Sequence, residues 1–279
     1  MLILNILEYL TIKKLKSPKF PAMNKEPIAD NRSVLLEVCA NSVTSAIAAQ
    51  DGGATRVELC ENLNEGGTTP SYGEILTARK LLGIKLYVLI RPRSGDFLYT
   101  DLEFKVMCEN VKYCIEANCD GIVLGMLNKD GSVDKHRCSE LVKMAKLGGV
   151  GVTFHRAFDV CADMYQALED IIDIGFERIL TSGGKTTAME GCNNIVRLIE
   201  KAAGRIVIMP GSGVNETNVA DLVNFTGATQ VHSSARVRVH SKMSYKNDQI
   251  IMSDTSTEYS NDVTDAERVR LILKMANQR

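Results

Sequence analysis

The stretch LLEVC at residues 35–39 is followed about twenty residues later by RVELC at residues 56–60. Both stretches are short and apolar, and in each a glutamate stands two places before a cysteine. Such runs are typical of buried β-strands, in which residues i and i+2 lie on one face. The four polar residues are Glu37, Cys39, Glu58 and Cys60. If the two strands are neighbours in register, two thiols and two carboxylates meet on one wall.

From Val34 onward, apolar runs alternate with helical patterns. The predicted strands are 34–39, 55–60, 85–91, 120–125, 150–155, 177–181, 205–209 and 229–232. The predicted helices are 42–50, 72–82, 101–117, 134–147, 163–174, 187–202, 215–225 and 264–277, with Asn215 as an N-cap. The glycine fingerprint of a dinucleotide-binding sheet is absent after the first strand. Eight βα units in this length therefore predict a TIM-like (β/α)8 barrel.

The barrel is expected to be a single domain over residues 33–279, preceded by a poorly ordered extension, residues 1–32. A long polar insertion at 233–261 precedes the last helix. Because it is long for a βα loop, we expect it either to cover the barrel mouth or to form an interface. Polar residues stand at the C-terminal ends of the strands, where barrel enzymes place their sites. They include Cys39, Cys60, Arg91, His155, Thr181, Gly211 and His232.

Composition excludes several classes of partner. The formal net charge of −1 does not indicate nucleic acid, and no apolar run is long enough to predict a membrane span. Eight scattered cysteines without a C-x-x-C pair indicate free thiols in a reducing compartment. We expect a cytoplasmic protein, with the nucleus as a second compartment and organelle targeting by residues 1–22 as a less favoured alternative.

The cysteine pair predicts a site for a soft metal ion. Thiolates select Cu(I), zinc or iron–sulfur chemistry, and neighbouring strands lie roughly 4.8 Å apart. Cys39 and Cys60 could therefore bridge one Cu(I) ion, which tolerates two linear sulfur ligands, whereas zinc would want four ligands. The alternative is that both are buried free cysteines acting as small apolar residues.

The two glutamates need partners, because ionised carboxylates are almost never buried alone. The expected partners are the arginines that follow the third and fifth strands, Arg91, Arg93 and Arg156. One interpretation is a layer of structural ion pairs. The other is a general acid–base pair, Glu37 and Glu58, with arginines that bind an anion.

His155 is a further candidate, since it ends a strand and is followed by Arg156 and Asp159. It could be a base, a ligand or a hydrogen-bond anchor. The loops after the seventh and eighth strands predict an anion site, because barrels frequently bind phosphate there. The candidate residues are Gly211, Gly213, Ser234 and Arg236.

Taken together, these motifs resemble the CutC-type copper homeostasis family. The matching stretches are 36–39, 56–60, 65–71, 90–97, 152–159, 180–183 and 234–236. The resemblance implies a TIM-like barrel, a cytoplasmic location, a homo-oligomer (dimer or tetramer) and copper handling, with Cu(I) on Cys39 and Cys60. Many relatives have three consecutive glycines where this chain has glycine, serine and glycine at residues 211–213.

Three functions are open at this point. The first is a protein that binds Cu(I) through two thiolates at the barrel mouth. The second is an enzyme, a hydrolase, lyase or isomerase, acting on a small anionic or phosphorylated metabolite. It would use Glu37, Glu58 and His155 for catalysis and the arginines for binding. The third is a scaffold whose charges are structural.

Overall fold

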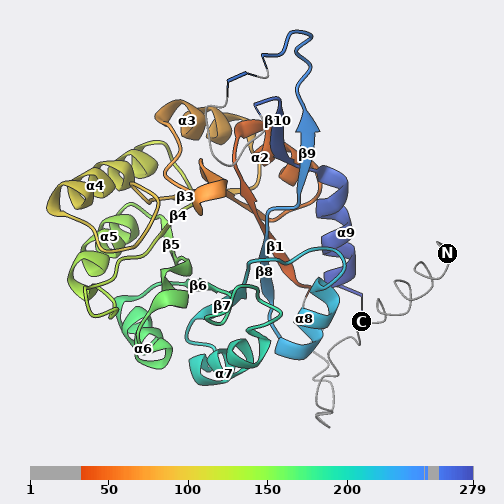
Figure 1. Cartoon of the computed structure of the whole chain (residues 1–279). Helices are drawn as coiled ribbons and strands as arrows, with labels where there is room; N and C mark the ends of the chain where they lie inside the picture. The colour runs from red at the N-terminus through yellow and green to blue at the C-terminus, as the bar shows by residue number, and fades with distance from the viewer. Residues whose placement is uncertain (1–32, 248, 251–257, 279) are drawn as a thin grey trace, which may run out of the picture. The chain divides into compact units, whose positions relative to one another are not determined.

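The computed structural model describes residues 33–247, 249–250 and 258–278. Its main sheet has eight parallel strands in the order β7-β6-β5-β4-β3-β2-β1-β8. They are β1 (Leu35–Ala40), β2 (Arg56–Leu59), β3 (Lys85–Leu89), β4 (Gly121–Leu124), β5 (Gly151–Phe154), β6 (Arg178–Thr181), β7 (Val207–Pro210) and β8 (Gln230–Ser233). β8 also lies beside β7, so the sheet nearly closes. Figure 1 shows the strands as an inner ring surrounded by helices, which confirms the predicted (β/α)8 barrel.

The helices alternate with the strands. They are α2 (Val43–Asp51), α3 (Tyr72–Leu81), α4 (Asp101–Glu116), α5 (Lys135–Leu147), α6 (Met164–Ile174), α7 (Cys192–Ala202), α8 (Val219–Thr226) and α9 (Ala266–Ala276). Two short 3-10 helices, η1 (Leu63–Glu65) and η2 (Arg156–Val160), follow β2 and β5. Most helices begin at a polar cap whose side chain accepts a backbone N–H, for example Ser71 before α3 and Thr100 before α4.

Two helices begin later than the sequence predicts. α7 starts at Cys192 rather than at 187, because Thr187 and Glu190 instead exchange side-chain hydrogen bonds with each other's backbone N–H groups. α8 starts at Val219, and the prediction that Asn215 is its N-cap is wrong. The Asn215 side chain accepts from the N–H of Thr217, which forms a separate Asx turn ahead of the helix.

The insertion before the last helix contains a hairpin. β9 (Arg236–His240) pairs antiparallel with β10 (Ser260–Thr264), and Figure 1 shows the hairpin beside α2. The N–H of Thr264 donates to the Ser45 hydroxyl on α2, which ties the hairpin base to the barrel. Residues 248 and 251–257 lie outside the described residues, as does the predicted extension 1–32. In the part of the chain described here, no helix is long and apolar enough to cross a membrane.

Among the residues that the structure describes, two separate apolar clusters are buried. The larger lies between the strands and the surrounding helices. The smaller is formed by side chains inside the barrel: Cys39, Cys60, Tyr87, Leu89 and Val123. The two cysteines therefore face the barrel interior and not the helices.

Tyr87 fills the barrel below the cysteines. The guanidinium carbons of Arg56 and Arg178 lie 5.0 and 5.2 Å from its ring centroid. Its ring packs so closely on Gly121 that a Cβ there would lie 2.1 Å from Tyr87 Cε1. The barrel accommodates this aromatic ring only because the neighbouring strand carries a glycine.

We expect Gly121→Ala to lower the free energy of unfolding by about 1–3 kcal/mol or more, because an added methyl group overpacks the interior. Urea denaturation measures the change. The matched control is Gly73→Ala on α3, where an added Cβ meets no atom within 4 Å. There alanine should be neutral or slightly stabilising. Equal denaturation midpoints for the two variants would contradict this account of the barrel interior.

Candidate functional site

The two sequence stretches lie side by side, displaced by two residues. β1 pairs with β2 so that Cys39 faces Glu58 and Glu37 faces Arg56. An even displacement keeps all four polar side chains of the two stretches on one face. The Sγ atoms of Cys39 and Cys60 lie 3.3 Å apart, and both thiols are free and buried.

Glu37 is a buried carboxylate with two partners. The Arg56 guanidinium donates to one of its oxygens, and His232 Nδ1 lies 2.8 Å from the other. Burial alone would raise the pKa of Glu37, but Arg56 and His232 outweigh it and lower the pKa to about 2. Glu37 is therefore an ionised anchor for both groups.

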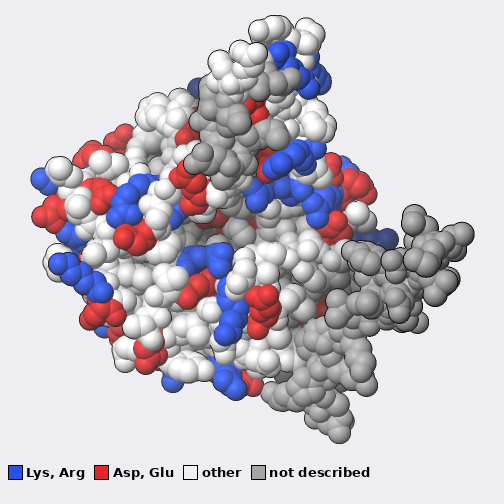
Figure 2. Space-filling view, viewed as in Figure 1, with Lys and Arg blue, Asp and Glu red and all other residues white. Residues whose placement is uncertain are grey.

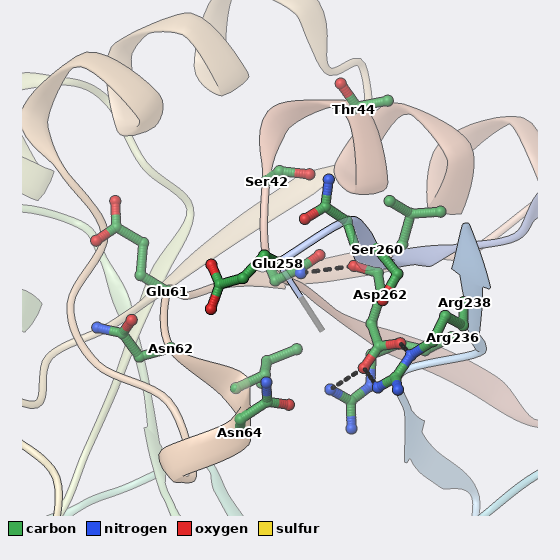
Figure 3. Close-up of a pocket in the computed structure, with 14 residues that line it drawn as sticks. Ser42, Thr44, Glu61, Asn62, Asn64, Arg236, Arg238, Glu258, Ser260 and Asp262 are labelled. Atoms are coloured by element: carbon green, nitrogen blue, oxygen red, sulfur yellow. Dashed lines mark hydrogen bonds and ion pairs between the residues drawn. The ribbon is translucent and has the colours of Figure 1, made fainter. Parts of the chain in front are cut away.

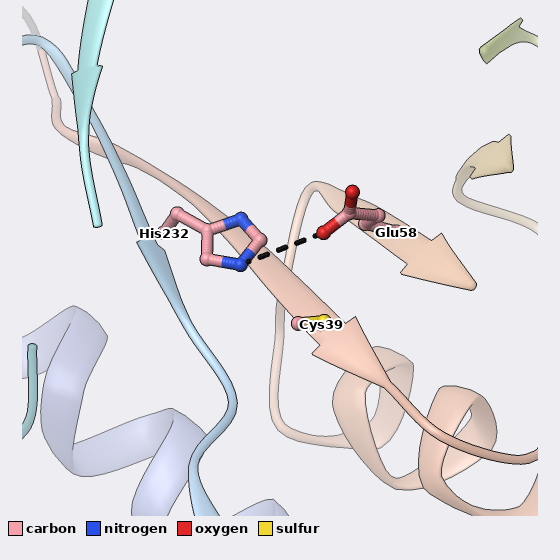
Figure 4. A group of neighbouring side chains, drawn as sticks. All are labelled: Cys39, Glu58 and His232. Carbon is pink, nitrogen blue, oxygen red and sulfur yellow. Dashed lines mark ion pairs between the residues drawn. The ribbon is translucent and has the colours of Figure 1, made fainter. Parts of the chain in front are cut away.

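His232 and Glu58 extend this cluster toward the thiols. His232 Nε2 lies 3.6 Å from a Glu58 oxygen. Potential ligand atoms of Cys39, Glu58 and His232 all lie within 4.8 Å of one another, and Figure 4 shows them converging from β1, β2 and β8. Burial raises the pKa of Glu58. The pKa of His232 is raised well above its usual value because its hydrogen bonds to Cys39 and Glu37, and the charge of Glu58, outweigh burial.

The Cys39 thiol does not ionise readily on its own. The hydrogen bond with Cys60 raises the pKa of Cys39 well above the ordinary thiol value, and burial and Glu58 add to this. A metal ion that binds here must displace protons from sulfur, as metal ions commonly do.

A cavity of about 400 Å³ lies above the thiols. Cys39, Cys60, Glu58 and His232 line one part of it. The rest is lined by the predicted catalytic residue His155 and by the predicted anion-site residues Arg91, Arg156, Gly213, Ser234 and Arg236. The structure thus gathers most of the candidates from both predicted sites around one hollow.

Three predicted residues do not line the cavity: Glu37, Arg93 and Gly211. Glu37 lies behind His232. Arg93 donates to Glu103 and Asp96, so its charge is balanced locally. The expectation that arginines after β3 and β5 pair with the glutamates is wrong, because the described partners are Arg56 and His232.

Arg91 links two loops of the cavity. Its Nη1 donates to the carbonyl of Gly67 at 2.6 Å, and its Nη2 donates to the carbonyl of Gly95 at 2.7 Å. Its Nε is buried and has no acceptor within the described residues. The hydroxyl of Tyr99 is likewise buried, and its pKa is raised to about 12 by burial, against the opposing effect of Arg91.

His155 is neutral in this environment. Burial and the charge of Arg91 lower its pKa to about 3. Its Nδ1 accepts the N–H of Ala157 at 3.1 Å, so the ring proton is on Nε2. Within the described part of the chain, Nε2 is buried without a partner.

Arg156 and Arg236 complete the basic side of the cavity. Arg156 pairs with Asp159 at 2.8 Å and donates to the Ser182 hydroxyl at 3.0 Å. Arg236 Nη1 lies 3.9 Å from an Asp262 oxygen. Figure 2 shows basic groups near the centre of the barrel face and beside the β9–β10 hairpin, with acidic groups interspersed.

A second, more polar cavity of about 660 Å³ lies under the hairpin. Figure 3 shows Glu61, Asn62 and Asn64 on one side of it and Arg236, Arg238 and Asp262 on the other. Arg236 lines both cavities. The hairpin therefore supplies a wall to the mouth of the barrel, in agreement with one of the two roles expected of the insertion.

Sequence reasoning missed two residues of the charge cluster. Arg56 begins β2 and shares a face with Glu58, so the i, i+2 rule could have identified it. His232 was visible as a polar residue at the end of β8. Its pairing with β1 residues, however, depends on closure of the barrel, which brings β8 beside β1.

Comparisons with known proteins agree with one another. The sequence model of the CutC family matches residues 34–237. A CutC family protein of Xylella fastidiosa is 49% identical over 87% of this chain and 89% of its own length. A human protein named as a copper homeostasis protein cutC homolog is 45% identical over 87% of this chain and 89% of its own.

Solved structures show the same fold. The CutC structure from Streptococcus agalactiae, named as a copper homeostasis protein, has a TM-score of 0.68 and 37% identity. It covers 72% of this chain and 98% of its own. A thiamine phosphate pyrophosphorylase from Pyrococcus furiosus has a TM-score of 0.54 and 14% identity, covering 87% and 95%, which is a likeness of fold alone.

The neutral state of His155 has a consequence for stability. In the unfolded chain His155 binds a proton below its ordinary pKa of 6.5. In the folded protein it binds that proton only near pH 3. The free energy of unfolding is therefore unaffected by protonation of His155 above pH 6.5. It decreases as the pH falls below 6.5, by about 2 kcal/mol at pH 5.

Between pH 7 and pH 5 we therefore expect the free energy of unfolding of His155→Asn to fall by about 2 kcal/mol less than that of the wild type. Urea denaturation at both pH values gives the comparison. Asparagine can still accept the N–H of Ala157, so the local turn is kept. Identical pH dependences would show that His155 is not held neutral.

Proposed function

This chain belongs to the CutC family, and we propose from this that it acts in copper homeostasis by binding Cu(I) between the thiolates of Cys39 and Cys60. The observation that carries the proposal is the pair of free thiols, 3.3 Å apart, at the floor of an open cavity. Thiolate sulfur is a soft ligand that selects Cu(I) over harder cations. The copper ion is the cargo of this site.

The sulfur positions suit an ion after a small adjustment. A linear sulfur–metal–sulfur arrangement needs about 4.6 Å between sulfurs, twice a metal–sulfur bond of about 2.3 Å. The sulfurs must therefore separate by roughly 1 Å, which side-chain rotation can supply. The cavity borders both cysteines and so offers their side chains space to rotate.

His232 is positioned to be a third ligand once the ion displaces its Nε2 proton; a third ligand bends the sulfur–copper–sulfur angle and shortens the sulfur separation that the site needs. Its Nδ1 is held by Glu37, which leaves Nε2 directed at Cys39 and Glu58. A histidine whose other nitrogen is bound to a carboxylate is the usual arrangement in metal sites, where the carboxylate fixes the ring. We propose that Glu37 and Arg56 serve this orienting role.

The proposal also includes the cellular location and the oligomeric state. The described cysteines are all free, which supports a reducing, cytoplasmic location. We propose a homo-oligomer, a dimer or tetramer, on the resemblance alone.

Catalysis is a second candidate, favoured by one observation. Glu58 lines the cavity and has a raised pKa, as a general acid or base requires. Glu37 cannot share this role, because it stays ionised and does not line the cavity. The expected pair of catalytic glutamates is thereby reduced to Glu58 alone.

The copper proposal predicts that Cys39→Ser combined with Cys60→Ser abolishes stoichiometric Cu(I) binding, because both soft ligands are lost. An anaerobic competition titration against a chromophoric Cu(I) chelator measures affinity and stoichiometry. The control is Cys108→Ser, which removes a partly buried thiol from α4 outside the cavity. Unchanged affinity in the double variant would refute the assignment.

A further inference from the structure

The cavity has a basic side that a copper ion does not need. Arg91 is 5% exposed, and no carboxylate forms an ion pair with it among the described residues. A buried charge without a counter-charge is costly unless something balances it. The carbonyl groups of Gly67 and Gly95 satisfy two of its nitrogens but leave the net charge unbalanced.

His155 adds a directed donor to the same side. It too is 5% exposed, and its Nε2 has no acceptor within the described residues. The ring is fixed, because Nδ1 is occupied by Ala157 and Phe97 packs against it with ring centroids 4.9 Å apart. Gly125 gives the ring its space, since a Cβ there would lie 2.7 Å from two ring atoms. A rigid, buried N–H without an acceptor requires explanation.

Both groups line one hollow of suitable size. The cavity of about 400 Å³ is within the range of small-molecule sites, about 300–1,000 Å³. Arg156 and Arg236 also line it; Arg156 pairs with Asp159, and Arg236 lies 3.9 Å from Asp262, which also binds Arg238. The positive charge of Arg91 is thus the excess that a ligand would balance.

We propose that this cavity binds a small oxyanion, the carboxylate or phosphate group of a metabolite, through the buried Arg91 and His155, with Arg236 at its edge. The negative charge of the ligand balances Arg91, and one of its oxygens accepts the N–H of His155 Nε2. The inference deepens the second candidate function of this cavity by naming its ligand class, yet it requires no reaction and no copper.

The ligand site and the thiol pair share the cavity without sharing residues. Cys39 and Cys60 lie at the β1–β2 wall, whereas Arg91 and His155 follow β3 and β5. An anion could therefore occupy the cavity while the thiols remain free. This separation allows the two functions to be tested independently.

The test is isothermal titration of the copper-free protein with inorganic phosphate and, separately, with malonate. We expect saturable binding of at least one probe. His155→Asn keeps the acceptor for Ala157 but removes Nε2, and should weaken that binding about tenfold or more. Arg236→Gln should also weaken binding of the probe. The matched control is Arg205→Gln, which removes a half-exposed arginine that pairs with Glu169 outside both cavities, and which should change nothing.

The pattern of results identifies the ligand group. Binding of phosphate alone assigns a phosphate site, binding of malonate alone a carboxylate site, and binding of both a general oxyanion site. If neither probe binds, or if His155→Asn and Arg236→Gln both bind like the wild type, the proposal is wrong. Should His155→Asn fail to fold by circular dichroism, Arg236→Gln decides.

The same titration of Cys39→Ser/Cys60→Ser protein separates this proposal from the copper function. Anion binding should persist in that variant even though its Cu(I) binding is lost. Loss of anion binding there would contradict the independence of the two sites.

Discussion

The buried carboxylate of Glu37 is the constraint on which the rest of the site depends. An ionised carboxylate inside a protein must be paired, and its partners come from the two strands that flank β1. Arg56 is on β2 and His232 is on β8. One charge thus ties β1 to both of its neighbouring strands. It also fixes the ring of His232, so that Nε2 is directed toward the thiols.

Two kinds of chemistry meet above this charge cluster. The β1–β2 wall presents soft sulfur, whereas the loops after β3 and β5 present a buried guanidinium and a neutral imidazole. A soft metal ion and a hard oxygen anion prefer these two sides respectively. The barrel architecture allows this combination, because each strand end contributes its own residue to one shared mouth.

The sequence predicts the barrel and the meeting of the thiols, since both follow from local patterns. Eight apolar runs mark the strands, and the spacing of Glu37 and Cys39 fixes their common face. The sequence could not predict contacts between residues that lie far apart along the chain. Arg56 lies on the strand that was expected beside β1, so only the contact between His232 and Glu37 depends on a strand far along the chain. The late starts of α7 and α8 depend on side-chain turns at Thr187 and Asn215. Arginines close to strand ends were plausible partners by sequence, yet Arg91 instead holds two loops.

The most direct measurement of the central claim is X-ray absorption spectroscopy at the copper edge of protein loaded with one Cu(I) per chain under anaerobic conditions. Our account predicts two sulfur scatterers and one nitrogen scatterer, at distances close to the roughly 2.3 Å and 2.0 Å of zinc–thiolate and zinc–imidazole bonds. A first coordination sphere made only of oxygen and nitrogen would contradict it.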